Sequence, residues 1–315
     1  MHMKFDRKNL REVYGETLVA LGERNPRVVV LDADLNTSTC THLFKARFPE
    51  RFIQCGIAEA NMFSIAAGMA YLGYVTFPST FAAFATRKAL DPLFMNICCQ
   101  RLTVKIPGAY PGLTATECGP SHNVCDDVAA IRALPHIKVA DAGDNRELAS
   151  MMFTMAEEAG PAYFRVPKAE LPVLFDDQYQ FAWGKGYEMR AGKDVTLAST
   201  GMMTGIALKA AELLRQEGYE ATVLHLPSIK PIDDGLLCQA AKRTGCILTL
   251  ENGRTIGGFG GAVAESVCRS YPVALDFMGV PDEPAKSCDL GTLLTHYQLT
   301  PRGVQQRAIA LIGKK

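Results

Sequence analysis

A single carboxylate stands at the head of a segment of small and apolar residues. Glu59 lies in the run 56–61 (GIAEAN), and residues 66–70 (AAGMA) continue the same expected helix. Carboxylates in such surroundings are rarely left without a partner, because an unpaired buried charge is costly. Burial raises the pKa of a carboxyl group, and a nitrogen partner gives it a hydrogen bond. The pattern favours a glutamate that exchanges a proton with a bound heterocycle, although the helix dipole alone also favours a first-turn glutamate.

Aromatic and imidazole side chains follow this carboxylate. Phe81 and Phe84 are three residues apart in the run 80–87 (TFAAFATR), so we expect them on one face of a helix. Such a pair belongs either to the core or to a flat ring, on which an offset stack adds about 1 kcal/mol. His122 closes the run 117–122 (ECGPSH), and histidine changes its charge near neutral pH. Taken alone, such a phenylalanine pair most often belongs to a core, and a loop histidine is most often solvated surface.

These motifs resemble the pyrimidine-binding domain of the transketolase family of thiamine-diphosphate enzymes. The resemblance implies that Glu59 hydrogen-bonds a ring nitrogen of the cofactor's aminopyrimidine and so promotes loss of the thiazolium proton. It implies that Phe84 packs on the aminopyrimidine, and it leaves Phe81 either there or in the core. Arg87 stands where transketolases proper have a tyrosine that contacts the same ring. Asp34 falls on an aspartate near the thiazolium side of the cofactor.

The resemblance also implies a substrate site. His122 inherits the binding of the sugar or of its phosphate. Cys118 replaces an aspartate that contacts a donor hydroxyl, and Tyr110 replaces a second substrate-contacting histidine. Both departures lie on the substrate side, so the reaction type is better supported than the identity of the sugar.

A cationic group is expected around the substrate phosphate. Arg11 aligns with an arginine that binds the acceptor phosphate, and Ser38 aligns with a phosphate-binding serine. Lys168 stands where many relatives have arginine, and lysine offers a point charge where arginine offers a two-pronged contact. A sulfonate fits the same charges as a phosphate. Exposed cations are commonly surface charges that contact only water, and we expect this of one of the two residues, Arg11 or Lys168.

Short apolar runs alternate with helical patterns along the chain, as in a doubly wound α/β protein. With the resemblance, this predicts two three-layer α/β/α domains: a pyrimidine-binding domain (1–175), a linker (176–192) and a transketolase C-terminal domain (193–315). The expected strands are 28–31, 74–78, 102–106, 137–140, 162–166, 195–199, 221–226, 246–251 and 273–278. The expected helices are 57–72, 81–97, 126–134, 145–159, 203–217, 257–271 and 301–312.

The glycine-rich run 257–261 (GGFGG) opens the expected helix of the second domain. Such a run suits a phosphate loop, but its place in this domain favours close backbone packing instead. Glu251 ends the preceding strand, and we expect it to be structural or to lie at a dimer contact.

The family's signature for the diphosphate and Mg²⁺, a Gly-Asp-Gly run followed by an asparagine, is not found in this sequence. We therefore expect no metal ligands here and a partner subunit that holds Mg²⁺ and the diphosphate. The chain resembles the C-terminal half of a transketolase encoded as two polypeptides. The resemblance implies a heterotetramer of two large and two small subunits.

Composition narrows the setting of the protein. The chain has 33 basic and 33 acidic residues, which does not favour nucleic acid or an anionic membrane as a partner. Its ten cysteines form no CxxC pair, as expected of reduced thiols in a cytosolic protein without a zinc site. No signal peptide is recognised and no apolar run approaches the roughly 20 residues of a membrane helix, so we expect a cytoplasmic protein.

The leading hypothesis is the small subunit of a split transketolase, which transfers a two-carbon ketol unit from a ketose phosphate to an aldose phosphate. Cys118 and Tyr110 leave open a specialised enzyme for a branched or sulfonated ketose. Two thiamine-enzyme alternatives are the β subunit of a 2-oxoacid dehydrogenase and half of a deoxyxylulose-phosphate synthase; residues 119–122 (GPSH) speak against the first, and 165–168 (RVPK) resemble the second. A non-enzymatic scaffold or regulatory half is the remaining alternative, and Glu59 speaks against it.

Overall fold

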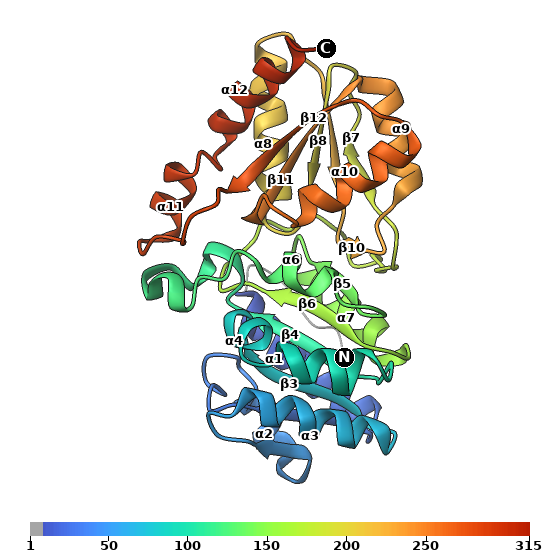
Figure 1. Ribbon diagram of the computed structural model, residues 1–315, viewed down its shortest axis with the longest axis vertical. Helices are drawn as coiled ribbons and strands as arrows, with labels where there is room; N and C mark the ends of the chain where they lie inside the picture. Colours follow the sequence, from blue (N-terminus) through green and yellow to red (C-terminus); the bar gives the residue numbers. More distant parts are fainter. Residues whose placement is uncertain (1–8) are drawn as a thin grey trace.

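The computed structural model describes residues 9–315 as two stacked α/β units (Figure 1). The first unit is built on a seven-stranded sheet in the order β10-β5-β6-β4-β3-β1-β2. All its neighbouring strands are parallel except β10, which pairs antiparallel with β5. Its strands are β1 (Val28–Asp32), β2 (Phe52–Gln54), β3 (Val75–Phe81), β4 (Lys105–Ala109), β5 (Lys138–Asp141), β6 (Ala162–Val166) and β10 (Ser228–Lys230).

Helices cover both faces of this sheet. Alternate residues of β1 point to opposite sides: Val29 and Leu31 pack with α3, and Val28 and Val30 pack with α1. The helices of the first unit are α1 (Leu10–Arg24), α2 (His42–Arg47), α3 (Glu59–Tyr71), α4 (Ala82–Arg87), α5 (Leu90–Pro92), α6 (Asp127–Arg132) and α7 (Asn145–Glu157). Short 3₁₀ segments, η1 (Pro49–Arg51) and η3 (Gly112–Ser121), and the π-helical segment η2 (Leu93–Cys98) complete it.

The second unit has a five-stranded sheet in the order β12-β11-β8-β9-β7, with only β7 antiparallel to its neighbour. Helices α8 and α12 lie on one side of it and α9 and α10 on the other (Figure 1). Its strands are β7 (Tyr187–Arg190), β8 (Val195–Ser199), β9 (Ala221–His225), β11 (Cys246–Arg254) and β12 (Ala274–Val280). Its helices are α8 (Met203–Gln216), α9 (Asp234–Thr244), α10 (Phe259–Ser270), α11 (Leu290–His296) and α12 (Pro301–Ile312). The predicted pair of three-layer α/β/α units is thus confirmed.

The helix expected over residues 81–97 is wrong. Phe81 is the last residue of β3, because Thr80 and Phe81 pair with Gly108 and Ala109 of β4. The remaining residues form three short segments, α4, α5 and η2. Pro92 lies where α5 ends and η2 begins, and proline lacks the N–H that a continuous helix requires.

The boundary between the two units is crossed by the chain more than once. Strand β7 lies within the stretch 176–192, which was predicted to be a linker. Strand β10 follows β9 in sequence yet joins the first sheet, with Ser228 paired to Ala140 and Lys230 to Val139. The second unit therefore supplies an edge strand to the first sheet. Within residues 9–315 no helix combines the length and the apolar character needed to cross a bilayer.

Candidate active site

Glu59 is the first residue of α3, and its side chain is buried beside a lysine. Only 4% of the Glu59 side chain is exposed, against 49% of Lys88. The Nζ atom of Lys88 lies 3.4 and 3.5 Å from the two carboxylate oxygens. Sequence reasoning asked for a partner to this carboxylate but missed Lys88. The signal was present, because Lys88 follows Phe84 by four residues and so lies on the same helical face.

An aromatic group adjoins this ion pair. The Lys88 ammonium lies 4.3 Å from the centre of the Phe84 ring. Phe81 and Phe84 stack with their ring centres 5.7 Å apart, and His122 meets both rings edge-on, at 5.7 and 5.2 Å. The prediction that the two phenylalanines share a helix is wrong, because one ends β3 and the other lies in α4. The structure nevertheless brings Glu59, both phenylalanines and His122 into one continuous group.

Tyr110 links the aromatic group to the expected cationic group. Its ring lies 4.5 Å from that of Phe81, and the Lys168 ammonium lies 5.5 Å from its ring centre. The Arg11 guanidinium donates a 3.0 Å hydrogen bond to the Tyr110 hydroxyl, which in turn donates to the backbone carbonyl of Ser38 at 3.5 Å. Arg11, Ser38 and Lys168 therefore converge on one tyrosine.

Three polar atoms of this region are buried without a hydrogen-bond partner. They are Nε of Arg11, Oγ1 of Thr80, which precedes Phe81, and Oδ1 of Asn123, which follows His122. Buried polar groups in folded proteins are nearly always hydrogen-bonded, and exceptions require an explanation. The guanidinium of Arg11 already reaches Tyr110, so a polar ligand beside Tyr110 would satisfy its unpaired Nε.

Ser121 and Arg87 hold the loop that carries His122. The Ser121 hydroxyl lies 2.8 Å from Nδ1 of His122 and donates to the carbonyl of Cys118 at 3.2 Å. The Cys118 side chain is exposed on η3. Arg87 forms an ion pair with Asp126 at 2.7 Å and donates to the carbonyl of Pro120 at 3.1 Å. The structure thus places the Arg87 guanidinium on the loop.

Asp34 lies on the loop after β1, where it is exposed. Its backbone N–H donates to the side chain of Gln54 at 2.9 Å. The next residue, Leu35, packs against Phe81 and Tyr110. Asp34 is therefore adjacent in sequence to a residue that packs against the aromatic group.

Three non-glycine residues around the site hold a left-handed backbone. They are Asp34 (φ 63°), Tyr110 (φ 57°) and Thr116 (φ 51°). Such conformations cost about 1–3 kcal/mol each and tend to cluster where a fold positions functional groups. Thr116 is the most unusual of them, because a β-branched side chain is rarely tolerated at positive φ. The surrounding packing therefore offsets the conformational free energy that these three backbone positions cost.

A fully buried ion cluster lies beneath the His122 loop. Arg165 on β6 donates to Asp127 at 2.8 Å through Nε, to Asp141 at 3.3 Å and to the backbone carbonyl of Asn252 at 3.0 Å. The Asn252 side chain accepts a 3.0 Å hydrogen bond from the backbone N–H of Leu113 in η3. Burial raises the pKa of Asp141 to about 6, although the arginine opposes this shift. The cluster fixes η3 to the second unit, and sequence reasoning did not identify it.

Close packing explains the glycine-rich run of the second unit, as predicted. A Cβ at Gly258 would approach Oε2 of Glu251 to 2.1 Å, and one at Gly260 would approach Phe277 to 2.6 Å. The Glu251 carboxylate accepts hydrogen bonds from the backbone N–H groups of Phe259 (2.8 Å) and Gly260 (2.9 Å). The start of α10 is thus capped by the chain's own carboxylate, so Glu251 has the structural role that was one of its two expected roles.

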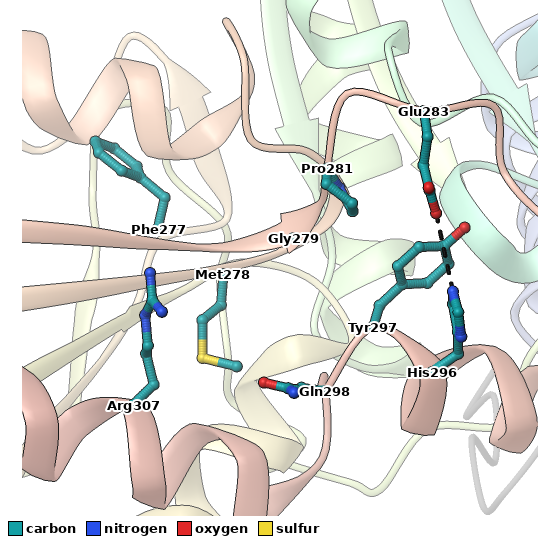
Figure 2. Close-up of a pocket in the computed structure, with 9 residues that line it drawn as sticks. All are labelled: Phe277, Met278, Gly279, Pro281, Glu283, His296, Tyr297, Gln298 and Arg307. Carbon is teal, nitrogen blue, oxygen red and sulfur yellow. Dashed lines mark ion pairs between the residues drawn. The ribbon is translucent and has the colours of Figure 1, made fainter.

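A cavity of about 400 Å³ lies apart from this site, in the second unit (Figure 2). Its acidic and basic side chains already have partners: His296 lies 3.8 Å from Glu283, and Arg307 lies 2.9 Å from Asp276. None of the predicted site residues lines it. In residues 9–315, no group of three or more histidine, cysteine, aspartate or glutamate side chains is arranged to hold a metal ion.

Family models and related proteins both match this chain to transketolases. The family model "transketolase, pyrimidine binding domain" matches residues 6–173, and "transketolase, C-terminal domain" matches residues 184–304. A putative transketolase C-terminal section from Methanocaldococcus jannaschii is 35% identical over 311 residues, 98% of each chain. A 6-deoxy-6-sulfo-D-fructose transketolase subunit from a Clostridium species is 35% identical over 280 residues, 89% of this chain and 87% of that one.

Solved structures agree with these matches. A split-gene transketolase, described as an inactive beta4 tetramer, superposes with a TM-score of 0.90 at 39% identity, over 96% of this chain and 98% of that one. A transketolase from Pichia stipitis shares the fold, with a TM-score of 0.81 at 20% identity over 98% of this chain and 46% of that one. By sequence and by fold, the chain belongs to the transketolase family and corresponds to its pyrimidine-binding and C-terminal domains.

Proposed function

We propose that this chain is the small subunit of a split transketolase. Together with a partner subunit it transfers a two-carbon ketol unit from a ketose phosphate to an aldose phosphate. The observation that carries the proposal is the buried carboxylate of Glu59 at the head of α3, adjoining the aromatic group of Phe81, Phe84 and His122. Glu59 meets a half-exposed lysine and adjoins a group of aromatic rings, which are the surroundings that an aminopyrimidine ligand would require.

The transketolase family depends on thiamine diphosphate, and the residues present here fit its aminopyrimidine half. Glu59 would bind a ring nitrogen, and the Phe84 ring would pack on the heterocycle. When bound, the cofactor supplies an electron sink for breaking and making a carbon–carbon bond. We assign its diphosphate and Mg²⁺ to the partner subunit. The names of the relatives, a C-terminal section and a split-gene enzyme, support that division.

The remaining site residues would hold the sugar phosphate. Arg11 and Lys168 supply positive charge next to Tyr110, and His122 lies 5.7 Å from the Phe81 ring. The buried, unpaired Nε of Arg11 supports an anionic ligand at this position. Tyr110 would orient Arg11 through its hydroxyl. Ser38 would join the phosphate contacts, as its backbone already lies against Tyr110.

A specialised ketose is the second candidate for the substrate. The exposed thiol of Cys118 and the hydroxyl of Tyr110, which is already bonded to Arg11, change the surface that a sugar would meet. Relatives named for 6-deoxy-6-sulfo-D-fructose (35% identical) and for apulose 4-phosphate (29% identical) match most of this chain. A sulfonate presents three oxygens to Arg11 and Lys168 much as a phosphate does. Deoxyxylulose-phosphate synthases, 34% identical, keep that reaction as a further alternative.

The exposed face of α3 is the surface that we assign to assembly. Its outward residues Asn61, Ser64 and Gly68 are small or polar, and Tyr71, 75% exposed, continues the same face. Phe94 and Met95 of the adjoining η2 are exposed beside it. Large exposed apolar side chains next to small helical ones are typical of an interface that a second subunit covers. We propose a heterotetramer of two large and two small subunits.

Co-expression with a candidate partner tests the function. The candidate is a chain that carries the Gly-Asp-Gly signature, and ketol transfer from xylulose 5-phosphate to ribose 5-phosphate is measured for the wild type and for Glu59→Gln. Activity that requires both chains and collapses in the variant supports the proposal. A pair that binds thiamine diphosphate but ignores these sugars points to the specialised substrate. A pair that binds no cofactor contradicts the enzyme hypothesis.

A further inference from the structure

The ammonium of Lys88 contacts both of the groups that the aminopyrimidine would need to contact. Its ammonium lies within 3.5 Å of both oxygens of Glu59 and 4.3 Å from the centre of the Phe84 ring. A ring that hydrogen-bonds Glu59 and stacks on Phe84 requires the same carboxylate and the same aromatic face. Lysine and cofactor therefore compete for one position.

The ion pair has a physical reason in the free subunit. A carboxylate that is 4% exposed is costly without a counter-ion, and Lys88 neutralises it. The ammonium also gains from the face of the Phe84 ring. Lys88 itself is 49% exposed, so its flexible four-carbon side chain reaches water without rearrangement of the core.

We propose that Lys88 is a displaceable counter-ion that holds the place of the aminopyrimidine until the cofactor binds. Binding is then an exchange, in which the ammonium leaves Glu59 for solvent and a ring nitrogen takes its position. The Lys88–Glu59 pair keeps the site formed in the absence of cofactor and lowers the apparent affinity for it. This inference rests on the proposed function and adds to it a counter-ion that competes with the cofactor.

The first test uses the chain alone. Lys88→Met, Glu59→Gln and the double variant form a thermodynamic cycle, read by urea unfolding. We expect a coupling that corresponds to about a two- to fivefold change in the unfolding equilibrium constant, the scale of a partly exposed ion pair. Additive effects of the two substitutions would show that the pair carries no interaction and would overturn the inference.

The second test uses the chain co-expressed with its diphosphate-binding partner. Thiamine diphosphate in the presence of Mg²⁺ is titrated by calorimetry into wild-type, Lys88→Met and Lys88→Arg assemblies. We expect the methionine variant to bind about two- to fivefold more tightly, because a competitor worth up to about 1 kcal/mol is gone. The arginine variant, which keeps the charge, should remain at or above the wild-type Kd.

Lys45→Met is the matched control, since Lys45 also lies over an aromatic ring, Phe52 at 5.5 Å, but on another element. Its Kd should equal that of the wild type. Weaker or unchanged binding by Lys88→Met, with the wild-type assembly binding normally, overturns this inference alone. A wild-type assembly that binds no thiamine diphosphate overturns the proposed function and this inference with it, and a coupling in the free chain would then mark the ion pair as purely structural.

Discussion

The Arg165 guanidinium on β6 donates a 3.0 Å hydrogen bond to the backbone carbonyl of Asn252 on β11, and so joins the two units of the chain. The same guanidinium holds Asp127 and Asp141, all within a buried cluster. Through the side chain of Asn252 the cluster reaches η3, which ends next to His122. The geometry of the candidate site thus depends on how the second unit is docked.

Substitution of this arginine should be severe. In Arg165→Met two carboxylates stay buried without their cation, which typically costs about 3–5 kcal/mol. The free energy of unfolding is measured by urea titration, with fluorescence of Trp183, the only tryptophan, as the probe. Arg190→Met removes a partly exposed partner of Glu212 and should cost less than about 1 kcal/mol. Similar losses in the two variants would contradict the importance of the buried cluster.

The Glu251 carboxyl gives the fold a defined pH dependence. Burial raises its pKa from 4.5 to about 7, against the hydrogen bonds from Phe259 and Gly260. The native state therefore binds this proton more tightly than the unfolded chain does. Its contribution is fully present below about pH 4.5 and is lost as the pH rises through about 7. The loss amounts to about 3 kcal/mol at the usual 1.36 kcal/mol per pKa unit.

Comparison with Glu251→Gln isolates this effect, because glutamine does not titrate. The unfolding free energy of the wild type minus that of the variant should fall by about 3 kcal/mol between pH 4.5 and 7. Asp141 titrates in both proteins, so its contribution cancels. The exposed Glu50→Gln substitution serves as the reference for pH effects unrelated to burial. A difference that stays flat over this range would contradict the assignment.

Tyr110→Phe should act on substrate binding. The substitution removes the hydroxyl that accepts the 3.0 Å hydrogen bond from Arg11 and keeps the ring against Phe81. With the guanidinium less well held, the KM for the phosphorylated sugar should rise about 3- to 10-fold while kcat changes little, as expected for one hydrogen bond. Steady-state kinetics of the assembled enzyme checks this, with the exposed Tyr271→Phe as control. A fall in kcat at constant KM would instead place Tyr110 at the reacting atoms.

Gly68→Glu should block assembly without harming the subunit. A Cβ at Gly68 meets no atom of this chain within 4 Å, so the fold accepts a side chain there. A carboxylate on the proposed interface would be buried against a partner at a cost of several kcal/mol. Sedimentation of the variant should show a folded chain that fails to join its partner, whereas Gly218→Asn, at another open glycine, should assemble normally. Normal assembly of Gly68→Glu would move the interface elsewhere.

Local patterns predicted the parallel strands well. The run 28–31 is a buried strand because both faces of its sheet are covered, and β1 (Val28–Asp32) appears where this pattern is found. The crowded surroundings of Gly258 and Gly260 also follow from their place at a strand-to-helix turn. Such features depend on residues close together in the sequence.

Long-range pairings could not be predicted in the same way. Strand β10 is three residues long, and only its contact with β5 makes it a strand. The fragmentation after Phe81 follows from pairing of β3 with β4, which extends the strand into the expected helix. Lys88 and Arg165 meet their carboxylates 29 and 38 residues away in sequence. Local spacing places Lys88 beside Phe84, but only the fold brings Lys88 to Glu59 and Arg165 to Asp127.

The excursion of β10 has a consequence for dissection of this protein. A fragment that ends before β7 would lack the strand that covers β5 and would present a bare parallel edge to solvent. Uncovered edges recruit strands from other molecules, so such a fragment is expected to aggregate. After cleavage in the stretch between β6 and β7, the two pieces would stay associated through the pairing of β10 with β5. The two units are distinct sequence domains, but the strand that they share makes them one physical structure.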